Sequence, residues 1–232
     1  MSEEKSHDIT ATQLNQLLIL SCSIVLGMCL VSAYAWLQLP DDIQIPVHWD
    51  IDGQADRYGG KAQGLLLMPG ITLLTCLLFR VIPIFEPRRH NLLRSMTAYR
   101  ITCLSVCMLL FGVHAATIGS LLGFFEINAI NLISLFLALM FIVIGNYLGK
   151  VRSNFLFGIR TPWTLSSDLS WNKTHRLGGK LFVLAGIVGL IGQLAPGDNA
   201  LLLLLGTLIP AVILMVVYSY LVWRDDPDKH PF

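Results

Sequence analysis

The sequence predicts an all-α integral membrane protein with six transmembrane helices and with both its N-terminus and its C-terminus in the cytoplasm. Composition, the spacing of apolar runs and the placement of basic residues all lead to this fold class. Of the 232 residues, 54% are hydrophobic and only 13% are charged, whereas soluble domains carry about 25% charged residues. The net charge of +1 gives no indication of a nucleic-acid partner.

Six apolar runs account for most of the chain. A helix needs about 20 apolar residues to cross the roughly 30 Å hydrocarbon core of a bilayer. The runs are 17–37, 65–85, 101–125, 127–149, 181–195 and 200–223. Arg80 lies near one end of the second run, where its side chain can reach the membrane surface. The fifth run is the shortest, and the turn signal of residues 196–199 separates it from the sixth.

The first run has one feature of a secretory signal, because Ala33-Tyr34-Ala35 resembles a cleavage site. The flank before it is acidic, however, and the run exceeds the roughly 7–15 apolar residues of a signal peptide. We therefore expect a retained helix.

Cys103, Cys107 and His114 fall on one face of the third run, within about 40° of one another. Three ligands spread over about 16 Å of helix rise cannot meet one metal ion unaided. We expect a packing seam instead, with His114 hydrogen-bonded to a neighbouring helix. All five cysteines lie in apolar runs, so the sequence predicts no disulfide framework. Separately, no metal and no cofactor are predicted.

Lysine and arginine are distributed very unequally between the two predicted sides. With the N-terminus inside, fourteen of the sixteen face the cytoplasm and only Arg57 and Lys61 lie outside, as the positive-inside rule requires. This orientation leaves one sizeable outer loop, 40–64, and one long inner loop, 150–179.

The outer loop allows three interpretations. Asp50, Asp52, Asp56 and His48 offer oxygen and imidazole ligands for a metal, but the glycine position departs from the calcium-loop pattern. An ordered turn is a second interpretation, with Arg57 paired to an aspartate and with Trp49 and Tyr58 at the membrane surface. The third is a docking surface for something that arrives from outside.

The inner loop carries helix-start signals. Thr161-Pro162 reads as an N-cap followed by proline at the first helical position. Ser167-Asp168 predicts a second short helix that ends at Gly178-Gly179. Trp163 and Trp171 would anchor the loop at the membrane surface. The basic residues would then face lipid phosphates or the inner mouth of the bundle, namely Arg160, Lys173, His175 and Arg176.

Both loops resemble segments of the SdpI family, the immunity proteins against the sporulation-delaying toxin. The inner loop contains G-N-Y-L-G-K at 145–150, N-F-x-x-G-I-R-T-P-W-T-L at 154–165 and W-x-K-T-H-R-L-G-G-K at 171–180. The outer loop contains I-P-V-H-W-D-x-x-G-x-x-D-R-Y-G-G-K at 45–61, which resembles a domain of unknown function often found ahead of it. The resemblance covers both exposed loops and their register with the spans.

The resemblance implies a bacterial inner-membrane protein that protects against a membrane-active peptide toxin and signals its presence. Its partners would be the lipid bilayer, a toxin on the outer side and a cytoplasmic regulator. The candidate functional residues are Asn146, Asn154, Gly158, Arg160, Thr161, Pro162, Trp163, Trp171, His175 and Arg176 inside, and Pro46, His48, Trp49, Gly53, Asp56, Arg57 and Lys61 outside. No catalytic role is implied for any of them.

The resemblance also suggests two domains. Residues 1–85 would form an N-terminal membrane segment with the outer-loop motif, and residues 86–232 an SdpI-like membrane domain. Two other functions stay open: a small transporter, and an enzyme at the inner face with His175 as general base and Arg160 holding a phosphate. The transporter has only His114 at mid-membrane depth, and the enzyme lacks any motif that supplies a nucleophile.

Overall fold

A computed structural model describes residues 2–50, 54–124, 126, 128–194 and 199–230, with side chains from residue 12 onward. Within these residues, six helices are long and apolar enough to cross a membrane. They are α1 (Ser2–Gln38), α2 (Lys61–Phe85), α4 (Met96–Leu121), α5 (Ala129–Leu148), α7 (Asp168–Gly192) and α8 (Ala200–Arg224). Two short helices, α3 (Arg89–Arg94) and α6 (Pro162–Ser166), and two strands, β1 (Gln44–Trp49) and β2 (Ala55–Gly60), complete the fold. The prediction of a six-helix membrane protein is confirmed.

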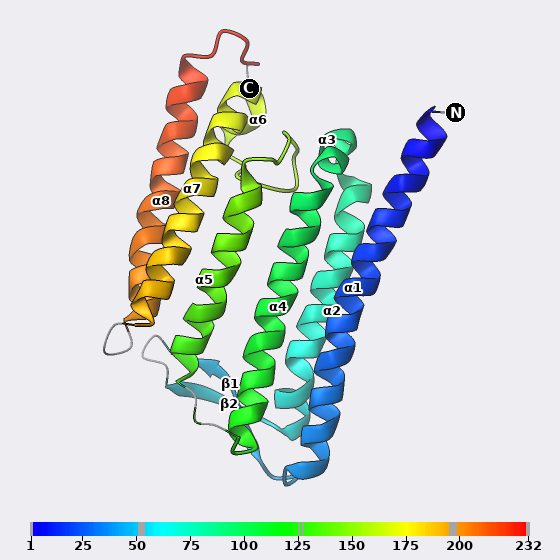
Figure 1. The fold of residues 1–232 in the computed structure, drawn as a ribbon, viewed down its shortest axis with the longest axis vertical. Helices are drawn as coiled ribbons and strands as arrows, with labels where there is room; N and C mark the ends of the chain where they lie inside the picture. Colours follow the sequence, from blue (N-terminus) through cyan, green and yellow to red (C-terminus); the bar gives the residue numbers. More distant parts are fainter. Residues whose placement is uncertain (1, 51–53, 125, 127, 195–198, 231–232) are drawn as a thin grey trace.

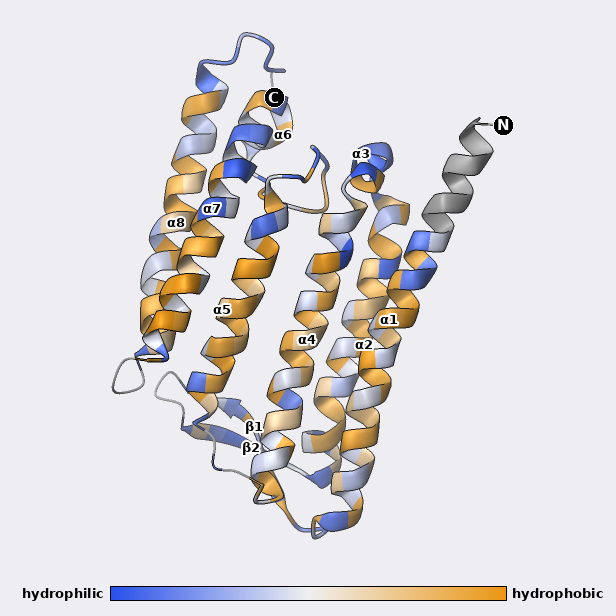
Figure 2. Ribbon diagram, in the orientation of Figure 1, coloured by the Kyte–Doolittle hydropathy of each residue, from blue (hydrophilic) through white to orange (hydrophobic). Residues whose placement is uncertain are grey.

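The long helices run side by side, and both chain ends lie at the same end of the bundle (Figure 1). We call this the loop end, because α3, α6 and the segment that connects α5 to α6 also lie there. The β1–β2 hairpin lies at the opposite end, the hairpin end. Hydrophobic residues dominate the length of the helices, and hydrophilic residues gather at the two ends (Figure 2). The orientation of this bundle in a cell stays a prediction.

Helix α7 corrects one prediction from the sequence. The short helix expected to end at Gly178-Gly179 is wrong, because α7 continues through both glycines to Gly192. These glycines allow close packing instead. A Cβ atom on Gly179 would lie 2.6 Å from the carbonyl oxygen of Gly145 in α5, and one on Gly178 would lie 2.6 Å from Sδ of Met215 in α8. The fifth span therefore begins inside the predicted inner loop.

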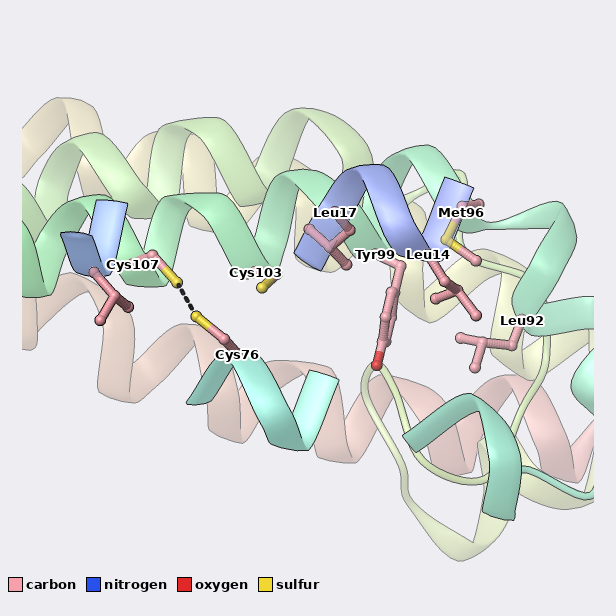
Figure 3. Packing of buried hydrophobic residues seen from close by; sticks show 9 residues of the cluster. Leu14, Leu17, Cys76, Leu92, Met96, Tyr99, Cys103 and Cys107 are labelled. Atoms are coloured by element: carbon pink, nitrogen blue, oxygen red, sulfur yellow. Dashed lines mark hydrogen bonds between the residues drawn. The ribbon is translucent and has the colours of Figure 1, made fainter. Parts of the chain in front are cut away.

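Helices α1, α2, α3 and α4 share one buried apolar cluster. Leu14 and Leu17 from α1, Cys76 from α2, and Tyr99, Cys103 and Cys107 from α4 meet there (Figure 3). The Tyr99 hydroxyl donates a hydrogen bond of 2.7 Å to the carbonyl of Phe79. The Sγ atoms of Cys76 and Cys107 lie 3.8 Å apart, and all five cysteines are free.

His114 is bonded as expected. It is buried in α4, and its Nε2 lies 2.9 Å from Oγ of Ser32 in α1, which in turn donates to the carbonyl of Leu65 in α2 at 2.7 Å. One histidine thus links three helices. Among the described residues, no group of three or more His, Cys, Asp and Glu side chains could hold a metal ion.

Residues 45–49 lie within β1, which pairs antiparallel with β2. Ile45 is almost completely buried, and Gly64 in α2 leaves the space that its side chain occupies. The hairpin is therefore fixed to the start of α2 by apolar packing rather than held by the turn alone.

Candidate functional site

The candidate site is the segment that joins α5 to α6, which we call the connecting loop (residues 149–161). It forms neither helix nor strand, so its backbone groups must find partners elsewhere. Some of those partners are side chains from α3, from α7 and from the residues just after α2, and others come from the loop itself and its flanks. The sequence motifs at 145–150, 154–165 and 171–180 all meet around this loop.

Glu86 anchors the middle of the connecting loop. It follows the last residue of α2, and it is 3% exposed. Its carboxylate accepts hydrogen bonds from the backbone N–H groups of Phe155 at 3.0 Å, Leu156 at 2.8 Å and Arg88 at 2.8 Å. Hydrogen bonds to an ionised acceptor are about twice as strong as neutral ones. A buried carboxylate thus substitutes for secondary structure here.

Two residues at the start of α3 hold the adjacent part of the loop. The Arg88 guanidinium donates to the Ser153 hydroxyl and to the carbonyl of Leu165, and lies 4.5 Å from the ring centroid of Phe155. The Asn91 side chain donates to the carbonyl of Ser153 at 2.9 Å. These contacts fix the loop to a part of the chain more than sixty residues earlier.

Asn154 shapes the loop from within. Its side chain is fully buried, and its Oδ1 accepts hydrogen bonds from the N–H groups of Leu156 at 3.1 Å and Phe157 at 2.7 Å. Its Nδ2 donates to the carbonyl of Arg152 at 2.9 Å. This pattern makes Asn154 a turn-forming residue.

His175 and Trp171 of α7 form the floor beneath the loop. Both side chains are fully buried, and their rings stack with centroids 4.1 Å apart. Trp171 Nε1 donates to the carbonyl of Val151 at 2.8 Å. His175 Nε2 accepts from the N–H of Ile159 at 2.9 Å, and its Nδ1 lies 2.8 Å from the Trp171 carbonyl. With Nε2 accepting and Nδ1–H donating, the imidazole is neutral.

The rings of His175 and Trp171 explain why position 158 is a glycine. Its φ is +117°, and a Cβ atom there would lie 2.5 Å from Nε2 of His175. Glycine is therefore required for its backbone conformation and for its closeness to the ring.

Hydroxyl groups organise the chain after the loop. Thr161 is the N-cap of α6 and forms a reciprocal capping box with Thr164, as the Thr-Pro signal predicted. Its Oγ1 lies 3.0 Å from Oγ of Ser219 in α8. Ser167 caps α7 and donates to the carboxylate of Asp226 just after α8, and that hydrogen bond lowers the pKa of Asp226 from its ordinary value.

The structure divides the candidate residues of the inner loop into two groups. Four of them are buried and structural, namely Asn154, Thr161, Trp171 and His175. The predicted membrane-surface position of Trp171 is therefore wrong, and of the two alternatives for His175 the one in which it faces lipid phosphates is wrong. Their rings are enclosed because the connecting loop covers them. Exposed are Asn146, Arg160, Pro162 and Arg176, while Trp163 is half-buried with its ring 5.3 Å from that of Tyr220.

The outer candidates lie at the hairpin end. His48 and Asp56 are both exposed, and Nδ1 of His48 lies 2.6 Å from Oδ1 of Asp56, an interaction that lowers the pKa of Asp56. Lys61 is buried and donates to the carbonyl of Leu39 at 2.6 Å and to Asp41 at 2.8 Å. Lys61 therefore ties the start of α2 to the segment that connects α1 to β1. Asp52 and Gly53, named as candidates, lie outside the described residues.

Trp49, Pro46 and Arg57 complete the outer set. Trp49 and Pro46 of β1 line a small cavity of about 190 Å³ with residues of α4 and α5, whereas Arg57 is exposed on β2. The hairpin thus rests over the seam between α4 and α5, at the end opposite the connecting loop (Figure 1).

Sequence reasoning did not identify Glu86, Arg88 or Asn91. One signal was present for Glu86, a lone carboxylate directly after an apolar run. Its partners are backbone N–H groups about seventy residues later, and backbone donors leave no trace in a residue pattern.

Comparisons with known proteins agree with the loop motifs. Residues 150–219 match the SdpI/YfhL protein family, and residues 23–73 match a domain of unknown function (DUF1648). The chain is 25% identical over 202 residues to the immunity protein SdpI of Bacillus subtilis (strain 168), which covers 87% of this chain and 93% of that protein. No solved structure matches the chain. The predicted resemblance to the SdpI family is confirmed.

Proposed function

Since the chain is an SdpI-like, multi-pass bacterial membrane protein, we propose that it protects its cell against a membrane-active peptide toxin. The observation that carries this proposal is the similarity to an immunity protein over 87% of the chain. Two family matches add support, one at residues 23–73, which contain the β1–β2 hairpin, and one at residues 150–219, which contain most of the connecting loop.

The orientation belongs to the same proposal. The loop end holds fourteen of the sixteen lysines and arginines, so it faces the cytoplasm and the hairpin end faces outward. A toxin would then meet the hairpin first, where His48, Trp49 and Arg57 lie. The exposed Arg160 and the half-buried Trp163 would present a surface to a cytoplasmic regulator.

Each of the two predicted domains would have its own role in this function. Residues 1–85 carry the hairpin and would receive the toxin, and residues 86–232 carry the connecting loop and would signal. The contacts from Arg88 and Asn91 to Ser153 would couple movement near the start of α3 to the loop.

The geometry around His175 supports a binding protein over an enzyme. A general base needs a free nitrogen within hydrogen-bond reach of a substrate. Both nitrogens of His175 are already engaged, and the ring is fully buried. Its observed contacts give it a structural role under the connecting loop.

A protection assay tests the proposal. The protein is expressed in a toxin-sensitive bacterium, and the tolerated dose is measured for a panel of membrane-active peptides. We expect a raised dose for a cognate peptide, and we expect Arg160→Ala and Trp163→Ala to remove that protection. Arg224→Ala is the matched control, since Arg224 is also exposed at the loop end but pairs with its neighbour Asp225.

Membrane abundance of each variant is measured in the same cells, so that loss of protein is separated from loss of function. Equal killing with and without the protein across the whole panel would contradict the immunity proposal. Full protection by both alanine variants would show that Arg160 and Trp163 are not needed for immunity.

A further inference from the structure

The groove between α4 and α5 has no part in the function proposed above. It has a volume of about 780 Å³, and it runs between Ile101 and Leu109 on α4 and between Phe136 and Lys150 on α5. Met108 is 50% exposed and Leu139 42% exposed along it. The groove therefore opens toward the lipid rather than into the bundle.

Glycines explain why this seam is open. On its other side α5 lies against α7, where Gly145 and Gly186 bring the backbones so close that a Cβ atom would lie 2.7 Å from Gly179 O and 2.5 Å from Ala138 O respectively. Between α4 and α5 the corresponding space holds a ring instead. Phe136 fills the place left by Gly112 in α4, and the groove begins there.

The depth of the groove matches one leaflet of a bilayer. From Phe136 to Tyr147, α5 rises about 16 Å at 1.5 Å per residue. Half of the roughly 30 Å hydrocarbon core is about 15 Å. The groove thus runs from mid-membrane depth to the surface at the loop end.

Polarity along the groove changes in the same direction. Leu104, Met140 and Val143 line its deeper part, and Asn146, Tyr147 and Lys150 line the loop end. Lys150 is exposed, with its Nζ 4.6 Å from the ring centroid of Tyr147, and it forms no ion pair with any described carboxylate. An apolar trough that ends at a lysine complements a molecule with a hydrocarbon chain and an anionic head.

The motif at 145–150 serves both sides of α5. Gly145 and Gly149 face α7, where a Cβ on Gly149 would lie 3.5 Å from Cα of Arg176. Asn146, Tyr147 and Lys150 face the groove. The Asn146 side-chain amide donates one N–H to the carbonyl of Ile142 at 2.8 Å, and its second N–H is a donor of the kind that a phosphate oxygen accepts. Helix packing accounts for the glycines of this motif but not for its polar residues.

A second groove on the other face of the seam serves as a contrast. It has about 820 Å³ and is lined by α1, α4 and α5, and Met108 and Phe136 line both grooves. No lysine or arginine lines it. It offers space for acyl chains without a site for a phosphate.

We propose that the groove between α4 and α5 binds one anionic phospholipid. Its acyl chain lies along Leu104, Met140 and Val143, and its phosphate lies at Lys150 beside Tyr147 and Asn146. The proposal stands apart from toxin protection, and it holds whichever end of the bundle faces the cytoplasm.

Native mass spectrometry of the full-length protein in detergent tests the site. Dioleoyl phosphatidylglycerol and dioleoyl phosphatidylcholine are added in equal amounts. We expect one retained phosphatidylglycerol in preference to phosphatidylcholine. Lys150→Gln should lower its retention about fivefold, the effect of one basic residue near an anionic surface. Lys173→Gln makes the same charge change at an exposed position of α7 and should not. Equal retention of the two lipids, or equal behaviour of the two variants, would overturn the proposal.

Val143→Phe tests the acyl-chain path independently. Val143 lines the groove and is 39% exposed, so a larger side chain fills the trough without entering the core. We expect reduced phosphatidylglycerol retention with an unchanged unfolding temperature. Retention equal to that of the unchanged protein would mean that the lipid lies elsewhere.

Discussion

A Cβ atom on Gly158 would lie 2.5 Å from Nε2 of His175, the atom that accepts the hydrogen bond from Ile159. Gly158→Ala should therefore displace the connecting loop from the ring of His175. The positive φ of +117° adds backbone strain of roughly 1–3 kcal/mol. We expect a lowered midpoint of thermal unfolding in detergent, measured by tryptophan fluorescence.

Gly123→Ala is the matched control, because Gly123 also has a positive φ, +73°, but open space around its Cβ position. It should carry backbone strain without a steric clash. A loss of stability from Gly158→Ala no larger than that from Gly123→Ala would show that contact with His175 is unimportant.

Glu86→Gln should loosen the connecting loop. The amide keeps one oxygen but places an NH₂ group where the carboxylate now accepts from the N–H of Phe155 or Leu156. A hydrogen bond to a charged group contributes about 1.5–3 kcal/mol, so local opening should increase at least about tenfold. Hydrogen exchange of residues 153–157, followed by mass spectrometry, measures this. Glu126→Gln, an exposed change near the hairpin end, should leave that exchange unaltered, and an equal effect from both would refute the anchoring role.

Gly179→Ala should separate α5 from α7. The added Cβ would meet the backbone of Gly145 at 2.6 Å, and backbone cannot move aside as a flexible side chain can. Overpacking of this kind costs about 1–3 kcal/mol. We expect lower membrane abundance and a lower unfolding temperature. Gly206→Ala in α8, where nothing lies within 4 Å, should be neutral; the prediction fails if both variants unfold alike.

Asp226→Ala should release the segment after α8. The Asp226 carboxylate accepts from the Ser167 hydroxyl that caps α7. Trypsin should then cut faster after Lys229, as detected by mass spectrometry. Asp225→Ala is the control, because Asp225 is exposed and contacts Arg224 only locally. Unchanged cleavage in Asp226→Ala would argue against this contact as a restraint.

The same contact predicts a pH dependence. Its hydrogen bond lowers the pKa of Asp226, so the folded state favours the ionised form. The stabilisation is present above the ordinary aspartate pKa of about 3.9, and it is lost as the pH falls through the lower folded value. The rate of cleavage after Lys229 by an acid-active protease should therefore differ between the unchanged protein and Asp226→Ala at higher pH. The two rates should become equal at low pH.

Local signals predicted local structure well. The Thr161-Pro162 pair correctly predicted the start of α6, because an N-cap residue and its helix are adjacent in the chain. The Gly178-Gly179 pair led to a wrong prediction of a helix end, because glycine is common both at helix ends and where two helices pack closely. Only the position of Gly145, more than thirty residues earlier, distinguishes the two uses.

The sequence pointed to some residues of the candidate site, but not to Glu86, Arg88 or Asn91 and not to the buried positions of its aromatic residues. His175 and Trp171 were recognised in a motif that suggested a basic surface, yet both rings are enclosed. Their enclosure depends on a loop that takes its shape from Glu86, about seventy residues away. Distances of that kind are set by tertiary structure, and a residue pattern does not contain them.

Glu86 has a consequence for how such proteins can be recombined. It lies outside both matched segments, 23–73 and 150–219, yet it satisfies donors within the second. A chimera that transplants residues 150–219 alone into another helical scaffold would leave the N–H of Phe155 without its acceptor and the N–H of Leu156 with Asn154 as its remaining acceptor. The smallest transferable unit of the loop must therefore include its distant carboxylate, and a gene fusion drawn at the segment boundaries would separate the two.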